Sequence, residues 1–429
     1  MSKKSSRSKE IKRDRLKGFQ VIASQNIKFR HPLKDVHTVS MFISGCGWVD
    51  TDDGVVLIDT LINRKAAKMT YDKIHEISGK IKYIIYTHGH GDHVGGCKVF
   101  MADKPEVIAS KYLPARLDKY RMLAQHRNRI SAQQFDLPEI KINEKSIDRI
   151  FSNLVYPTKT FLGEMTFSLG GKTFELHTTR AETDDACWVW IPEINAAFVG
   201  DLIIGNFPNI GNPWKPARFA LDWAKALEEV RAKEPEIIFA NGAGIMYKDD
   251  VSAVLDANIE AIRNMHDQVI DCINKDMHIT EMIHKIQLPD HLKNNPYLRF
   301  LYSRPEFFVY NVYRWYHGYF DGNPANLLPR PEKEVMNEIY NIIGNPEKIL
   351  NRAKDLFDQN QVQLGLQILD ILIQADPENI EARKLRIRML KKLGSRDYCL
   401  MSRNAWVYFI KKDKKFIRSK EKDKTNQKN

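Results

Sequence analysis

The chain has 429 residues, of which 43% are hydrophobic and 28% charged, a composition ordinary for a globular protein of about two domains. No stretch approaches the ~18 consecutive apolar residues of a membrane span, and no apolar run follows the charged N-terminus, so a cytoplasmic protein is expected. The five cysteines are scattered and odd in number, which argues against a disulfide framework.

The formal net charge of +12 is concentrated at the two ends of the sequence. Residues 1–18 hold eight basic and two acidic side chains, and residues 411–429 hold nine and three, which gives +6 at each end and a neutral body. Both ends are expected to be basic, disordered tails. Because the neutral body offers no basic groove, a nuclease and a nucleic-acid partner are not expected.

The first part of the chain alternates short apolar runs with turns and helical patterns, which predicts an α/β fold. Two α/β halves are expected, with strands near 38–45, 55–59, 81–86, 166–167, 172–176, 186–191, 196–199 and 237–240, and helices near 66–78 and 219–233. Beyond about residue 250 the strand pattern stops, and amphipathic helices are predicted at 251–275, 280–286, 305–316, 332–343, 346–359, 362–375 and 377–393. The later helices should form antiparallel pairs similar to a tetratricopeptide hairpin.

A loop rich in metal-binding side chains follows the apolar run that ends at Tyr86. His88, His90, Asp92 and His93 lie within six residues, and the intervening glycines let the backbone wrap closely around an ion. Imidazole suits zinc and similar divalent ions, and a carboxylate adds the negative charge that a bound cation needs. The spacing therefore predicts a metal site that could serve two neighbouring ions. Cys97 could be a further ligand or could pack at the start of the next helix.

Two later acidic residues are candidates for the remaining ligands. Glu182 precedes the predicted strand at 186–191, and Asp201 follows the predicted strand at 196–199. An acid in a loop is common without a metal, so each residue taken alone is ambiguous. A carboxylate at Asp201 could bridge two ions.

These motifs resemble the metallo-β-lactamase superfamily, whose early Asp matches Asp59 and whose third ligand, usually a histidine, would here be Glu182. The exchange is similar to the alkyl sulfatase branch. The segments at 304–307 and 314–324 also resemble the dimerisation domain of that branch. The resemblance implies an αβ/βα sandwich over residues 19–250, a helical dimerisation domain over 251–410, and a homodimer. It assigns His88, His90 and Glu182 to one ion and Asp92, His93 and Asp201 to another.

The sequence departs from the alkyl sulfatase pattern at two places. Ala243 stands where the superfamily has its last histidine ligand, so the second ion loses one ligand. The arginine-rich stretch that follows the bridging carboxylate in alkyl sulfatases is reduced to Lys215 and Arg218, the candidates for holding an anionic head group. His177 and His317 are further candidates for a ligand or a proton donor.

The expected function is a zinc-dependent hydrolase that uses metal-activated water on a small ester, and the resemblance implies a sulfate ester. Asp92 would orient the attacking oxygen while binding metal. The alternative is a degenerate member of the fold that acts as a dimeric binding protein with an incomplete second metal site, and Ala243 supports that reading.

Overall fold

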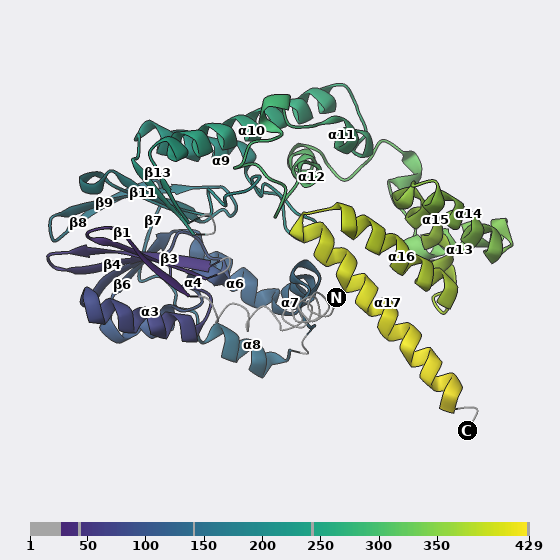
Figure 1. Ribbon diagram of the computed structural model, residues 1–429, viewed down its shortest axis with the longest axis horizontal. Coiled ribbons are helices and arrows are strands. Elements are labelled where there is room, and N and C mark those ends of the chain that lie inside the picture. The colour runs from purple at the N-terminus through teal and green to yellow at the C-terminus, as the bar shows by residue number, and fades with distance from the viewer. Residues whose placement is uncertain (1–26, 42–43, 140–141, 242–243, 427–429) are drawn as a thin grey trace, which may run out of the picture. The chain divides into compact units, whose positions relative to one another are not determined.

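The computed structural model describes residues 27–41, 44–139, 142–241 and 244–426 (Figure 1). The expected tail at residues 1–18 lies outside the described residues. The described chain forms two compact units, one within residues 27–130 and 138–317 and the other within 131–137 and 318–426. Within the described residues, no helix is long and apolar enough to cross a bilayer.

The first unit contains a seven-stranded sheet whose strands follow one another in sequence order. β1 to β4 are antiparallel neighbours, whereas β4, β5, β6 and β7 run parallel. Their bounds are β1 Lys28–Leu33, β2 Val36–Met41, β3 Ser44–Thr51, β4 Gly54–Ile58, β5 Ile81–Ile85, β6 Glu106–Ser110 and β7 Lys159–Phe161.

A second, six-stranded sheet has the order β13-β12-β11-β10-β9-β8. Its neighbours are antiparallel except for the parallel pair β11 and β12. The bounds are β8 Glu164–Leu169, β9 Lys172–Thr179, β10 Ala186–Ile191, β11 Ala196–Gly200, β12 Ile237–Ala240 and β13 Gly244–Tyr247.

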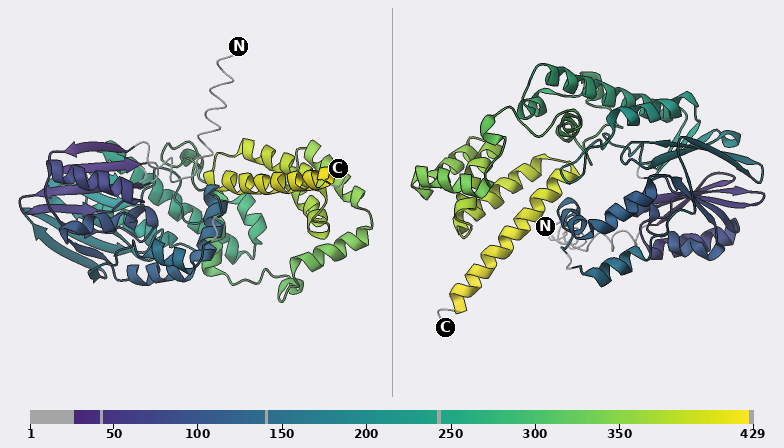
Figure 2. Two further views of the ribbon diagram at one scale, coloured as in Figure 1. Left: turned by 90° about the horizontal axis from the view of Figure 1, so that it is seen from below. Right: turned by 180° about the vertical axis from the view of Figure 1, so that it is seen from behind.

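The two sheets pack face to face with helices on their outer faces (Figure 2). Apolar side chains from both sheets, including Val56, Ile58, Val189 and Phe239, form the core between them. Helix α3 (Arg64–Ile77) covers the first sheet, and α9 (Ala220–Ala232) covers the second. The predicted αβ/βα sandwich is confirmed.

Several further helices belong to the first unit. They are α4 Gly91–Val94, α5 Cys97–Phe100, α6 Leu113–Met122, α8 Glu144–Phe151, α10 Asp249–Asn274, α11 Ile279–Lys285 and α12 Pro305–Tyr316, with the first part of α7 Ala124–Phe135. Because α10 and α12 bury apolar side chains in the same core as α9, the first unit extends to residue 317, beyond the expected boundary at 250. Cys97 is fully buried and packs against the first sheet.

The second unit is helical, with α13 Glu332–Ile343, α14 Pro346–Asp358, α15 Val362–Ala375, α16 Ile380–Arg396 and α17 Leu400–Asn426. The predicted disordered tail at 411–429 is wrong for residues 411–426, because α17 continues through them. Asp413 in this helix is fully buried and forms ion pairs with Arg383 and Arg386 of α16. These pairs, together with the burial of Ile417, hold the basic segment against the helical core.

Candidate metal centre

The metal loop begins where strand β5 ends. Because β4 and β5 are parallel, their carboxyl ends lie at the same edge of the sheet, which places Asp59 beside Thr87. The Asp59 carboxylate accepts hydrogen bonds from the Thr87 N–H at 2.8 Å and from the Thr87 hydroxyl at 2.7 Å. His88 follows directly, and Asp92 and His93 stand in the short helix α4. The loop is therefore fixed to the sheet by a buried carboxylate.

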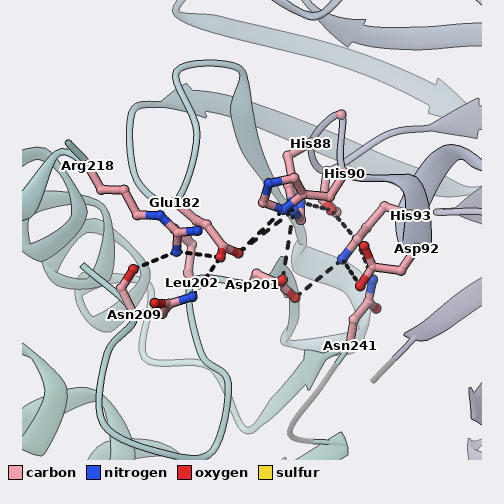
Figure 3. A network of polar contacts seen from close by, with 12 residues as sticks. His88, His90, Asp92, His93, Glu182, Asp201, Leu202, Asn209, Arg218 and Asn241 are labelled. Atoms are coloured by element: carbon pink, nitrogen blue, oxygen red, sulfur yellow. Dashed lines mark hydrogen bonds and ion pairs between the residues drawn. The ribbon is translucent and has the colours of Figure 1, made fainter. Parts of the chain in front are cut away.

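Four of the predicted ligands come together at this edge (Figure 3). His88, His90, Glu182 and Asp201 each offer an atom within 4.8 Å of the others. The Glu182 Oε2 atom lies 3.9 Å from His88 Nε2 and 3.7 Å from His90 Nδ1. Three segments distant in sequence thus converge on one point, although the ligand role of each residue stays a prediction.

Asp201 also faces the other predicted ligand group. Its Oδ2 lies 3.8 Å from His88 Nε2, whereas its Oδ1 lies 3.4 Å from His93 Nε2. The Asp92 Oδ2 atom is 3.7 Å from the same nitrogen of His93. Asp201 therefore stands between the two groups, as a bridging carboxylate must. Position 243 lies outside the described residues.

His93 is held from behind by Asp59. The His93 ring is fully buried, and its Nδ1 atom lies 2.8 Å from Asp59 Oδ2. Asn241 donates to the same carboxylate oxygen at 2.5 Å. A carboxylate on one ring nitrogen fixes the tautomer of a histidine and leaves the other nitrogen free to bind a metal. Here that free nitrogen is Nε2, which faces Asp92 and Asp201.

Glu182 is held by a buried arginine. The Arg218 guanidinium forms an ion pair with Glu182 Oε1 and donates at 2.5 Å to the backbone carbonyl of Asn209. The Asn209 side-chain amide donates to Glu182 Oε1 at 3.1 Å. Both contacts engage Oε1, so Oε2 remains directed at His88 and His90. The guanidinium proposed from sequence to hold substrate is therefore engaged with a predicted ligand.

His90 is supported by residues that sequence reasoning missed. The Tyr120 ring is parallel to the His90 ring, with 6.5 Å between centroids, and Arg116 donates to the Tyr120 hydroxyl at 3.0 Å. Arg116 also pairs at 2.6 Å with Asp185, whose carboxylate accepts from the Gly89 N–H at 2.8 Å. Tyr120 and Arg116 lie on α6, a helix that no sequence motif predicted. Only the run of acids at 184–185 gave any signal.

The electrostatics of the site favour neutral imidazoles at His88 and His90. Burial, followed by the positive charge of neighbouring groups, lowers the pKa of both rings well below the ordinary value. Burial acts in the same direction on His93, but the carboxylates of Asp201, Asp59 and Asp92 outweigh it and raise its pKa well above the ordinary value. The site thus concentrates negative charge on the His93 side, where a cation is favoured.

The donor set fits a divalent metal ion. His93 Nε2 and Glu182 Oε2 are buried, and neither has a hydrogen-bond partner among the described residues. Leaving a buried polar atom unpaired costs about 1–3 kcal/mol. Both atoms face the cluster, so a cation there would satisfy them. The mixture of imidazole nitrogen and carboxylate oxygen suits zinc.

Other predicted residues lie around or away from the cluster. Burial and the charges of Arg127 and Arg218 lower the pKa of Lys215 to about 7, although its side chain keeps some exposure. The His177 ring stacks on Trp188 with 4.2 Å between centroids, and His177 is not one of the four residues that form the cluster. Burial and the negative charge of Glu182 raise the pKa of Tyr302. Sequence reasoning gave no sign of Tyr302.

The fold and the donor set together define a metallo-β-lactamase type of protein, and comparison with known families agrees. Residues 41–242 match the metallo-beta-lactamase superfamily, and residues 278–414 match the alkyl sulfatase dimerisation family. The chain therefore contains a metallo-β-lactamase domain followed by an alkyl sulfatase dimerisation domain, as the sequence motifs predicted.

The relatives are alkylsulfatases. A linear primary-alkylsulfatase from a Pseudomonas species is 23% identical over 367 residues, which cover 81% of this chain and 69% of the relative. An alkyl/aryl-sulfatase of Saccharomyces cerevisiae is 23% identical over 85% of this chain and 60% of its own length. The structure of a stereoselective inverting sec-alkylsulfatase from Pseudomonas matches with a TM-score of 0.79 and 21% identity, over 89% of this chain and 64% of that one. This chain thus spans about 55–69% of its curated relatives' lengths.

Proposed function

We propose that this protein is a zinc-dependent hydrolase that cleaves a sulfate ester into an alcohol and sulfate, with the consumption of one water molecule. The observation that carries the proposal is the convergence of His88, His90, Glu182 and Asp201 within 4.8 Å at the edge of the sandwich. The alkylsulfatase relatives support the choice of a sulfate ester.

Each ligand would be held by this chain's own supporting groups. When bound, zinc acts as a Lewis acid and lowers the pKa of a coordinated water from about 15.7 to about 7. Arg218 engages Oε1 of Glu182 and leaves Oε2 for the ion. Asp59 fixes the tautomer of His93, so that Nε2 can bind. Asp92, one-fifth exposed beside His93, orients the attacking water.

The anionic head group of the ester would be held by Lys215. Burial and the positive charges of Arg127 and Arg218 lower the pKa of Lys215, whereas the negative charges of Glu182 and Asp92 act in the opposite direction, so its ammonium interacts electrostatically with two predicted ligands. Arg218, occupied by Glu182, positions that ligand rather than touching substrate. An ammonium next to the centre would stabilise negative charge on the ester oxygens.

We further propose that the chain is a homodimer, which the alkyl sulfatase dimerisation domain supports. The alternative function, a dimeric binding protein with an incomplete second metal site, is favoured by one feature of the sequence, the segment Asn241-Gly242-Ala243-Gly244, which lacks a histidine. The two functions differ in turnover and not in oligomeric state.

The test is turnover of a panel of alkyl sulfates and carboxylic esters by the zinc-loaded protein, with sulfate or acid release as the readout. We expect sulfate release by the natural sequence and its loss in Glu182→Ala, with Glu193→Ala as the matched control because Glu193 lies outside the cluster. A zinc-loaded dimer that turns over no ester would support the binding protein. In that case Ala243→His should create turnover if the missing ligand is the reason.

A further inference from the structure

A second group of metal-binding side chains lies on the hairpin formed by β1 and β2. Arg30 pairs with Thr38 across this antiparallel hairpin, and the register shifts between Arg30 and Leu33, where His31 and His37 come into contact. The two Nδ1 atoms lie 2.5 Å apart, and the ring planes are inclined by 83°. The two ring nitrogens therefore face each other at hydrogen-bond distance. Neither residue belongs to the cluster around His88.

His37 is oriented by its surroundings. Its side chain is only 8% exposed, and its Nε2 atom lies 2.7 Å from Asp50 Oδ2. The ring also stacks on the buried Trp48 indole, with 4.9 Å between centroids and 19° between planes. A carboxylate that accepts from Nε2–H leaves the lone pair on Nδ1, the atom that faces His31. The same arrangement of Asp and His supports metal ligands elsewhere in proteins.

His31 supplies access for an ion. It is exposed on β1, an edge strand of the seven-stranded sheet, so water can reach the point between the two rings and complete a coordination shell. His31 can rotate into place, whereas His37 is already fixed by Asp50 and Trp48. One exposed and one buried imidazole on paired strands thus offer two nitrogens for a single ion.

We propose that His31 and His37 bind one divalent transition-metal ion through their Nδ1 atoms, at a site separate from the catalytic centre. Imidazole favours copper and zinc, and the order of affinities should place Cu²⁺ above Ni²⁺ and Zn²⁺. The ion takes the place of the hydrogen shared by the two nitrogens, and that hydrogen moves to Nε2 of His31, so both imidazoles bind in their neutral forms. It also ties the edge strand β1 to β2.

The test is a Cu²⁺ titration of the full-length protein with its catalytic centre already loaded with zinc, with tryptophan fluorescence and bound copper as readouts. A copper ion at His37 lies beside Trp48 and should quench its emission. We expect one equivalent of copper and the accompanying quenching to disappear in His31→Ala. The exposed position of His31 should leave the fold and ester turnover intact.

His177→Ala is the matched control, because His177 stacks on Trp188 in the same manner but has no second histidine facing it among the described contacts. It should keep both the copper equivalent and the quenching. Ni²⁺ should raise the melting temperature of the zinc-loaded protein, and His31→Ala should abolish that rise. Unchanged copper stoichiometry and quenching in His31→Ala would overturn the proposal, whatever the outcome of the ester assays.

Discussion

Replacement of Asp59 by Asn tests whether the Asp59 carboxylate supports His93 as a metal ligand in a protein that still folds. The Oδ1 atom of Asp59 accepts from the Thr87 N–H, which can only donate, so the oxygen of the new amide must occupy that place. The amide nitrogen then replaces Oδ2 and faces His93 Nδ1, now 2.8 Å from the carboxylate. His93 must accept there and carry its hydrogen on Nε2, the nitrogen that faces Asp92 and Asp201.

The expected effect follows from this change of tautomer. A histidine with a hydrogen on its ligating nitrogen cannot bind metal until it changes tautomer, and loss of such a supporting carboxylate lowers metal affinity about 10–100-fold. That range corresponds to about 1.4–2.8 kcal/mol of binding free energy. The Asn241 amide donates to Asp59 Oδ2 and loses this acceptor when an amide nitrogen takes its place. The free energy of unfolding should therefore fall by about 1–3 kcal/mol.

The assay is competition for zinc between the protein and a chelator of known affinity, with circular dichroism to confirm the fold. Asp103→Asn is the matched control, because Asp103 is also buried and lies 3.0 Å from His75 Nε2, outside the centre. It should lose stability but keep its zinc affinity. A folded Asp59→Asn protein with unaltered zinc affinity would refute the role assigned to the carboxylate.

Three further substitutions test the charges that surround and support the site. Arg218→Met leaves the buried Glu182 uncompensated, so the metal-free protein should lose about 3–5 kcal/mol of unfolding free energy, and zinc should restore part of it. Because the pKa of Lys215 is lowered to about 7, its ammonium is present below this pH and lost above it. KM for a sulfate ester should therefore rise between pH 6 and 8, and Lys215→Arg should make KM independent of pH in this range. Asp413→Ala removes the buried carboxylate shared by the partly buried Arg383 and Arg386 and should destabilise the helical unit by about 3–5 kcal/mol.

Each of these expectations has a distinct contradiction. Arg263→Met breaks an exposed pair with Glu228 and should lower the free energy of unfolding by only about 0.2–1 kcal/mol. An equally small loss in Arg218→Met would show that burial does not strengthen the Arg218–Glu182 pair. An identical KM profile in the natural protein and Lys215→Arg would exclude the ammonium from substrate binding. Unchanged amide exchange in α17 of Asp413→Ala would show that the buried pairs do not hold this helix.

The sequence predicts the sandwich well because its strands are short apolar runs bounded by turns. The runs at 186–191 and 237–240 coincide with β10 and β12, which are buried on both faces. The helices at 305–316, 332–343 and 362–375 coincide with α12, α13 and α15. The basic segment from residue 411 was harder to predict, because a run of charged residues in a disordered tail and the exposed face of a helix have the same composition. Only the structure shows that Asp413 pairs with Arg383 and Arg386.

The candidate site was also predicted only in part, since the sequence indicates its ligands but not the residues that support them. The predicted ligands lie next to strand ends, and the parallel pairing of β4 with β5 brings Asp59 beside the histidine loop. Glu182 and Asp201 lie next to strands of the other sheet. The supporting residues carry no such signal, because Tyr120 and Arg116 approach the loop from α6, a helix that the sequence analysis did not predict. Arg218 could be found as a basic residue, but only the structure shows that it pairs with Glu182.

The central claim of the proposed function is that His88, His90, Glu182 and Asp201 would hold a zinc ion on which cleavage of a sulfate ester depends. It is tested most directly by measuring sulfate release from an alkyl sulfate as the metal-free protein is loaded with zinc in steps. Our account predicts that sulfate release rises in proportion to zinc occupancy and that Glu182→Ala removes both. Full zinc occupancy with no sulfate release, or release that is independent of zinc, would contradict it.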